Sequence, residues 1–208
     1  MKQIRKLLLI IAIFLPNTLK IFVYRQLGWN IGGNVKIGFS YIDCELVTIS
    51  NNGKIGHFNI IRRLKYLEIG KDSYIRNFNQ FFFSGEKSER PEWAATIVMK
   101  NNVHFMSHHF IDADGSVLID DDVTIAGRDT HIWTHGFLPA KDGGLEYTRT
   151  KVSIGKKAYI GSRASILNNV PDRAIVGLGS IVNKSFTVEK DSRFLIAGNP
   201  AVIKKQYL

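Results

Sequence analysis

The chain is poor in several features that would narrow its class at once. Cys44 is the one cysteine among 208 residues, which excludes an intrachain disulfide and any zinc framework built on paired cysteines. The longest unbroken apolar run, residues 7–15, has nine residues, whereas a membrane-spanning helix needs roughly 20. With 45% apolar and 22% charged residues, the composition is that of a folded domain and not of a disordered chain.

Acidic residues are also scarce at the start of the chain. The protein carries 28 Lys and Arg against 18 Asp and Glu, a net charge of +10, and six of the basic residues precede the first acid, Asp43. A basic end favours an anionic partner such as a lipid surface or an acidic polymer. Nucleic acid is not expected as a partner, because the basic residues are not interleaved with aromatic residues in a recognisable binding module.

Residues 1–28 predict a helical segment that is both apolar and basic. Pro16 should divide it, because proline lacks a backbone donor. No small-x-small cleavage site follows the apolar run, which argues against a signal peptide. Two compatible interpretations stay open, peripheral membrane contact through residues 1–25 and a cap on the end of the following domain, with an uncleaved signal or anchor as a third. The apolar residues that share one helical face are Ile4, Leu7, Leu8, Ile11, Leu15, Leu19, Phe22 and Val23.

From Ile31 onward, aliphatic residues recur every six positions, often followed by glycine. Such a period belongs to neither a helix nor an alternating strand, and it indicates a solenoid. Three six-residue units would form one triangular turn of eighteen residues, with each aliphatic side chain pointing inward and Gly, Asn or Asp at the corners. The first members of the series are Ile31, Ile37, Asp43, Ile49, Ile55, Ile61 and Leu67, and a shift of two residues starts the next series at Ile69.

This pattern resembles the hexapeptide-repeat acyltransferases, most clearly in KVSIGKKAYIGSRASILNNV (151–170), AIVGLGSIVNK (174–184) and the closing AGNPA (197–201). The resemblance is greatest to polysaccharide and maltose-type O-acetyltransferases and covers most of the chain. It implies a mainly β fold, a left-handed parallel β-helix, with an N-terminal helix at 1–28 and the acyltransferase domain at 29–208. Polar breaks in the repeat at 84–95 and 136–150 predict two protruding loops.

Five of the six histidines lie between residues 104 and 135, next to the second loop. By resemblance, His135 takes the family position of the general base that removes a proton from a sugar hydroxyl, with His131 as the alternative. Asp142 and Glu146 are candidates to orient its ring. His108, His109 and Trp133 are expected to contact the acceptor, although a purely structural role for the two histidines is as well supported.

The resemblance also implies acetyl-CoA as co-substrate, bound between subunits of a homotrimer. No metal is expected, and Cys44 is expected to be buried, so direct transfer is predicted without a covalent acyl-enzyme. A backbone N–H at Gly161 or Ser162 could support the oxyanion of the tetrahedral intermediate. Residues matched to cofactor contacts are Gly161, Ser162, Gly177, Asn183, Lys184 and Lys204, with Lys205 as a second phosphate candidate.

The predicted function is therefore O-acetylation of a sugar hydroxyl, in a cell-surface polysaccharide or its precursor. The predicted location is the cytoplasm, at the inner face of the cell membrane if the N-terminal segment binds lipid. Three alternatives remain. They are a soluble acetyltransferase for an antibiotic or amino sugar, a γ-carbonic-anhydrase-like zinc enzyme using His104, His109, His131 and His135, and a non-catalytic β-helix scaffold.

Overall fold

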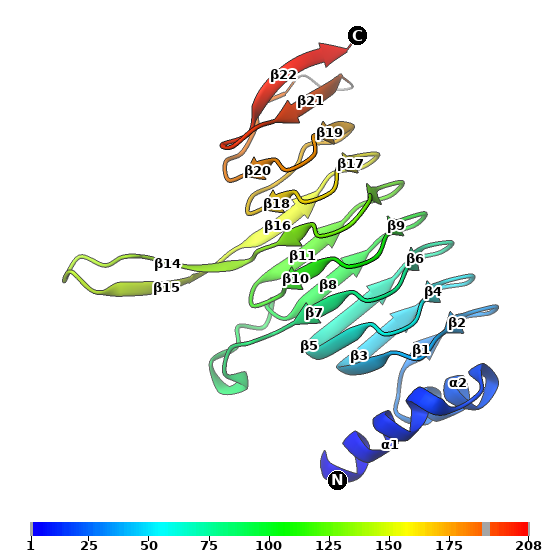
Figure 1. The fold of residues 1–208 in the computed structure, drawn as a ribbon. Coiled ribbons are helices and arrows are strands. Elements are labelled where there is room, and N and C mark those ends of the chain that lie inside the picture. Colours follow the sequence, from blue (N-terminus) through cyan, green and yellow to red (C-terminus); the bar gives the residue numbers. More distant parts are fainter. Residues whose placement is uncertain (1, 189–191, 208) are drawn as a thin grey trace.

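A computed structural model describes residues 2–188 and 192–207 and shows a left-handed parallel β-helix with two helices across its N-terminal end (Figure 1). The coils have three faces. Face I contains the first halves of β3 (Tyr41–Ile49) and β5 (Ile60–Ile69), then β7 (Gln80–Phe82), β10 (Phe110–Asp112), β13 (His131–Ile132), β18 (Ser165–Ile166) and β20 (Ile181–Val182). Face II contains β1 (Asn30–Ile31), the second halves of β3 and β5, β8 (Thr96–Met99), β11 (Ser116–Ile119) and β16 (Lys151–Ile154).

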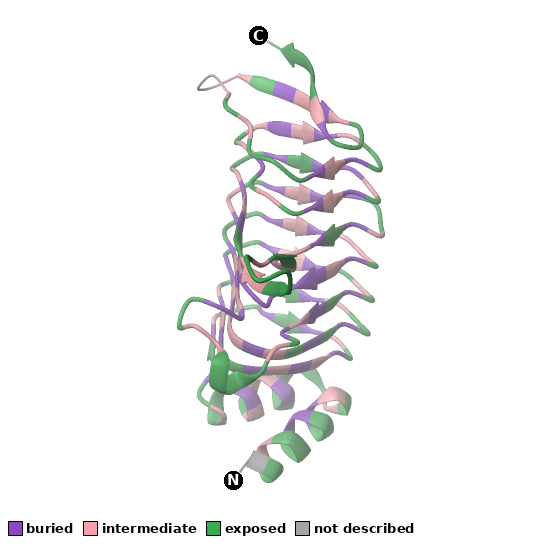
Figure 2. Cartoon of the chain, turned by 90° about the vertical axis from the view of Figure 1, so that its left-hand side faces the viewer, coloured by how far each residue is buried: buried purple, intermediate pink, exposed green. Residues whose placement is uncertain are grey.

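Face III forms a separate parallel sheet that an antiparallel strand closes at the C-terminal end. Its members are β2 (Lys36–Ile37), β4 (Lys54–Ile55), β6 (Tyr74–Ile75), β9 (His104–Phe105), β12 (Thr124–Ile125), β17 (Tyr159–Ile160), β19 (Ala174–Val176), β21 (Arg193–Ala197) and the antiparallel β22 (Val202–Tyr207). The aliphatic residues of the repeat are buried, and Figure 2 shows buried positions recurring along the whole solenoid. The predicted column of stacked aliphatic side chains is thereby confirmed.

Coil length varies around the predicted eighteen residues. Ile31 pairs with Ile49 at that spacing, Ile49 with Ile69 and Phe105 with Ile125 at twenty, and Ile160 with Val176 at sixteen. In the twenty-residue coils, two extra residues widen the corner between faces I and II, where Leu64 is buried beside the regular column. This widening accounts for the two-residue shift in the sequence period.

The corners follow different rules. Asn or Asp adopts a positive φ at most turns between faces II and III, which suits residues that tolerate the left-handed region. The corner between faces III and I instead places Phe58, Phe78 and His108 in that region, at φ of about 60°. The Phe58 and Phe78 rings stack at 5.1 Å between centroids and the Phe78 and His108 rings at 4.9 Å, so aromatic stacking helps to hold these backbones.

Pro16 divides the N-terminal segment into α1 (Lys2–Phe14) and α2 (Asn17–Gln26), as predicted. The α2 helix covers the open end of the first coil. The buried Lys20 donates from Nζ to the carbonyls of Ile37 and Gly38, at 3.1 and 2.7 Å, and Asn17 bonds both Val35 O and Ile37 N. These contacts satisfy backbone groups that an exposed sheet edge would leave unpaired. Among the described residues, no helix is long and apolar enough to span a membrane.

Both interruptions of the repeat leave the solenoid at the corner between faces I and II. The first contains a short 3-10 helix, η1 (Lys87–Glu89), and the second forms an antiparallel hairpin of β14 (His135–Pro139) and β15 (Leu145–Arg149). The hairpin projects sideways from the solenoid (Figure 1). The predicted loops are therefore present, and His135 is the first residue of β14.

Candidate active site

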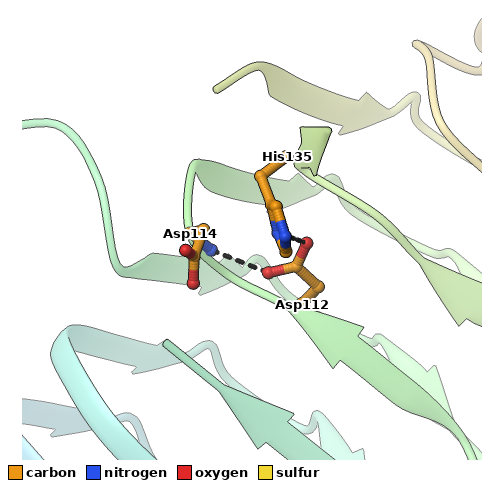
Figure 3. Close-up of side chains that lie close together, drawn as sticks. All are labelled: Asp112, Asp114 and His135. Carbon is orange, nitrogen blue, oxygen red and sulfur yellow. Dashed lines mark hydrogen bonds and ion pairs between the residues drawn. The ribbon is translucent and has the colours of Figure 1, made fainter. Parts of the chain in front are cut away.

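His135 lies at the base of the hairpin and forms a pair with an acid from the coil below. Its Nδ1 and Asp112 Oδ2 are joined by a short hydrogen bond (Figure 3). Asp112 is the last residue of β10, and its side chain is 4% exposed, whereas that of His135 is 24% exposed. A carboxylate at Nδ1 fixes the imidazole with its proton on that nitrogen, which leaves Nε2 as an acceptor.

Two backbone hydrogen bonds hold the Asp112 carboxylate in place independently of His135. Oδ1 accepts the backbone N–H of Asp114 at 3.0 Å, in an Asx turn, and Oδ2 accepts that of Thr134 at 3.3 Å. Burial raises the pKa of Asp112, although these two hydrogen bonds and the nearby His135 oppose the rise. The buried Asp112 carboxylate is therefore held in a fixed orientation, and its ionised form is stabilised by His135.

A second acid connects both insertions to the same site. Asp114, fully buried, accepts a hydrogen bond from the Ser84 hydroxyl at 2.9 Å and a short one from the Tyr147 hydroxyl on β15. Burial works against its ionisation, but the bonds from Tyr147 and Ser84 dominate and lower the pKa of Asp114. The Tyr147 ring lies 5.3 Å from that of His135, so Asp114 fixes the hairpin beside the candidate base.

The predicted orienting acids are therefore incorrect. Asp142 and Glu146 both lie exposed on the hairpin, and Asp142 accepts the backbone N–H of Gly144 in its turn. Asp112 had no local signal to single it out, because it precedes His135 by 23 residues. Only the register between coils could have revealed it. The widened coil that contains the Asp-Ala-Asp-Gly turn places residue 112 beside residue 133, two residues before His135.

A groove of about 360 Å³ lies on face I, and the predicted acceptor residues line it. It runs from His108, which is exposed at the corner between faces III and I, to the half-buried Trp133, two residues before His135. The Phe110 ring lies 5.1 Å from that of Trp133. The lining residues are Phe78, Gln80, His108, His109, Phe110, Asp129, His131 and Trp133.

His109 is buried beneath the groove, which favours its structural role over acceptor contact. Its side chain is 2% exposed, its Nδ1 accepts the Thr130 N–H at 3.0 Å, and its ring packs edge-on against Phe105. Burial lowers the pKa of His109 to about 4, with His108 and His131 adding to the effect and Asp129 opposing it. Protonation of this ring would place a charge in the core.

His109→Gln is expected to make the protein less sensitive to acid. Because the pKa of His109 is lowered on folding, the unfolded chain binds more protons between about pH 6.5 and 4, and stability falls as the pH decreases through this window. From pH 7 to pH 5 the wild type should lose about 2 kcal/mol more unfolding free energy than the variant. Urea unfolding at both pH values measures the difference. An equal loss in the two proteins would contradict the burial argument.

The residues matched to cofactor contacts occupy both edges of face I. Gly161, Ser162 and Gly177 follow β17 and β19 at the corner between faces III and I, whereas Asn183 and Lys184 are exposed at the other end of β20. Lys204 is exposed on β22. The Gly161 N–H donates to Val176 O at 2.8 Å, so the proposed oxyanion role of that N–H is incorrect. A Cβ on Gly161 would lie 2.9 Å from Val176 O, which explains the glycine by close packing of coils.

The zinc alternative required histidines that the structure separates. His104 stacks on Tyr74 on face III, His109 is in the core, and His131 lies on the outer surface of face I. In the described part of the chain, Asp112, Asp114 and His135 form the one group with ligand atoms close enough to share an ion. Hydrogen bonds among these three residues, Tyr147 and Ser84 account for that group without invoking a metal.

No protein-family model and no curated protein matches the sequence. Among solved structures, the chain is similar to a UDP-N-acetylglucosamine acyltransferase from Campylobacter jejuni, with a TM-score of 0.58 and 19% identity over 85% of this chain. The chain spans 62% of the length of that protein. A maltose O-acetyltransferase from Clostridium difficile 630 matches 97% of this chain and 83% of its own, with 15% identity and a TM-score of 0.48. The first similarity establishes the fold, a left-handed β-helix of hexapeptide repeats.

Proposed function

We propose that the protein is an acetyl-CoA-dependent O-acetyltransferase that modifies a sugar hydroxyl, with His135 as general base. The observation that carries the proposal is the His135–Asp112 pair, in which Nδ1 is held by a buried carboxylate, two residues along the chain from Trp133 of the groove on face I. A histidine held in this tautomer presents Nε2 as the acceptor that general-base catalysis needs.

In each turnover His135 takes up one proton and then releases it. Nε2 takes the proton of the acceptor hydroxyl as its oxygen attacks the thioester carbonyl carbon, forming a C–O bond and a tetrahedral intermediate. The C–S bond then breaks, and the leaving sulfur takes the proton from Nε2. Asp112 stabilises the transient imidazolium without itself being protonated. The products are an acetylated hydroxyl and a free thiol, so no covalent acyl-enzyme is required.

Cys44 offers no competing nucleophile. It is fully buried beneath face I, and burial raises the pKa of its thiol, so the reactive thiolate is suppressed. Direct transfer in a ternary complex is therefore the mechanism we infer.

A sugar suits the groove because its walls combine aromatic and polar groups. Trp133 and Phe110 offer apolar ring surface, while His108, His131 and Gln80 offer hydrogen-bonding atoms. Its volume of about 360 Å³ is in the range of small-ligand sites. We assign acceptor contact to His108 and Trp133, and a structural role to His109.

The two edges of face I suggest how acetyl-CoA would bind. Gly161, Ser162 and Gly177 lie across the face from His135, so one chain does not bring them together. We propose a homotrimer in which the glycine edge of one subunit faces the His135 edge of its neighbour. The exposed Lys184 and Lys204 are then candidates for the phosphates, since lysine acts as a mobile point charge.

The physiological acceptor we propose is a cell-surface polysaccharide or its precursor, modified in the cytoplasm at the inner face of the cell membrane. The basic, apolar N-terminal segment supports this choice over a soluble antibiotic or amino sugar, which would not require it. A scaffold without activity would need neither the groove nor the oriented histidine.

Acetyl-CoA binding and thiol release test the proposal together. Isothermal titration calorimetry should detect acetyl-CoA binding to the purified protein, and a thiol-reactive dye should report release that depends on an added oligosaccharide. Panels of hexose, hexosamine and sialic-acid oligomers would identify the acceptor class. A protein that does not bind acetyl-CoA would rule out the transferase assignment and favour the scaffold.

A further inference from the structure

The α1 helix presents an apolar face that packs against nothing in the described chain. Six large side chains on it are between 37% and 73% exposed. Along a helix they fall on one continuous side, because their spacing follows the 3.6-residue period. They are Ile4, Leu7, Leu8, Ile10, Ile11 and Phe14.

The opposite side of α1 is fixed to the β-helix, so this exposure is built into the fold. Leu9 and Ala12 are completely buried, and Arg5 donates a short hydrogen bond to Cys44 O and lies 3.6 Å from Asp43. Both helices cover the end of the solenoid, α2 over β1 and β2 and α1 over β3. This covering uses only the buried side of α1, so it does not explain the six exposed side chains.

Charge indicates what covers this face. The α1 helix contains no acidic residue, its Lys6 is exposed, and six basic residues precede the first acid, Asp43. A second copy of α1 would bring two basic ends together, which is unfavourable, whereas anionic lipid headgroups complement them. With 13 residues, α1 is too short to cross a bilayer but suits the interface.

We propose that the exposed face of α1 binds the surface of an anionic membrane, with its apolar side chains among the acyl chains and Lys6 among the headgroups. Both helices lie at the N-terminal end of the solenoid, so this contact places the coils above the membrane (Figure 1). The two interpretations of the N-terminal segment are then compatible, because α1 packs on the solenoid with one side and contacts the membrane with the other.

One consequence, which rests on the proposed function, concerns the acceptor. From β3, which contacts α1, the pairing runs through β5 and β7 to β10, three strand spacings or about 14 Å. With the helix diameter, the His135–Asp112 pair stands about 25 Å from the lipid. A membrane-tethered glycan of several sugar units fits that height, whereas a sugar attached directly to the lipid would not reach the base.

Co-sedimentation with vesicles tests the membrane contact without any assay of acetyl transfer. The full chain should sediment with phosphatidylcholine/phosphatidylglycerol vesicles, weakly with phosphatidylcholine alone, and less as salt is raised. Leu7→Glu/Ile11→Glu should reduce binding at least tenfold without lowering the Tm, because both side chains are exposed. The matched control is Leu145→Glu, which adds a charge at the exposed hairpin tip and should bind normally.

Three results would overturn the proposal. The first is no sedimentation with anionic vesicles, and the second is equal binding to neutral vesicles. The third is concentration-dependent self-association in light scattering that Leu7→Glu/Ile11→Glu abolishes, which would assign the face to a second copy. If the wild-type protein does not bind acetyl-CoA, only the proposed reaction is refuted and the membrane contact is unaffected. Failure of one proposal can therefore be told from failure of the other.

Discussion

His135→Ala is expected to lower the kcat of acetyl transfer by about 10³-fold. The variant lacks the Nε2 that takes the hydroxyl proton, and water cannot replace a base held in place by Asp112. The KM for acetyl-CoA should change little, because the substitution leaves intact the glycines and lysines assigned to the co-substrate. Steady-state thiol release at saturating acceptor measures both quantities.

His57→Ala provides the control for this variant. His57 is an exposed histidine at the corner between faces III and I of an earlier coil, outside the groove, where its Nδ1 accepts the Phe39 N–H. Its removal should leave kcat within about twofold, as is usual for a surface substitution. A His135→Ala enzyme with undiminished kcat would refute the assigned base and make His131 the next candidate.

Asp112→Asn should separate catalysis from stability. An amide in this position no longer favours the histidine tautomer with its proton on Nδ1, so kcat should fall by about 10² to 10⁴-fold. Stability should not fall with it. Since burial raises the pKa of Asp112, the protonated carboxyl group is the form that the fold favours: its contribution to stability is fully present below the unfolded pKa and is lost as the pH rises through the folded pKa. At pH 7 the charge is therefore a cost that asparagine removes.

Asp114→Asn is the matched variant, and its effect on the free energy of unfolding should have the opposite sign. The pKa of Asp114 is lowered on folding, so its charge stabilises the protein above the unfolded pKa and the effect is lost as the pH falls through the folded pKa. Urea unfolding at pH 7 should give an unchanged or higher free energy for Asp112→Asn and a lower one for Asp114→Asn. If both variants are destabilised equally, the two acids are not electrostatically distinct. If Asp112→Asn keeps full kcat, the carboxylate does not orient the base.

Local and periodic features of the sequence were sufficient for the fold. The six-residue period predicted the stacked coils because every inward aliphatic obeys the same rule wherever it lies in the chain, from Ile31 to Val182. Breaks in that period marked both insertions, and Pro16 marked the division between the helices. Each of these signals depends on neighbours within a few residues, so a single sequence is enough to predict the fold.

The site depended on contacts between coils. Asp112 reaches His135 only because the widened corner sets a coil of about twenty residues, and a spacing of eighteen would have paired different residues. The same register buries His109 while leaving His108 exposed, although the two are adjacent in the sequence. Likewise, the helical period predicted one apolar face on the N-terminal segment, but only the packing of Leu9 and Ala12 showed that α1 turns that face outward.

The sequence alone therefore determined that this protein is a β-helix with a candidate base at the edge of an insertion. The tertiary structure alone decided which acid orients that base, which histidines can reach a ligand and which helix is free to bind a surface. The physical reason is that inward and outward positions repeat locally, whereas the partner of a side chain depends on coil lengths summed over the intervening chain. A change of two residues at one corner is enough to alter every such pairing above it.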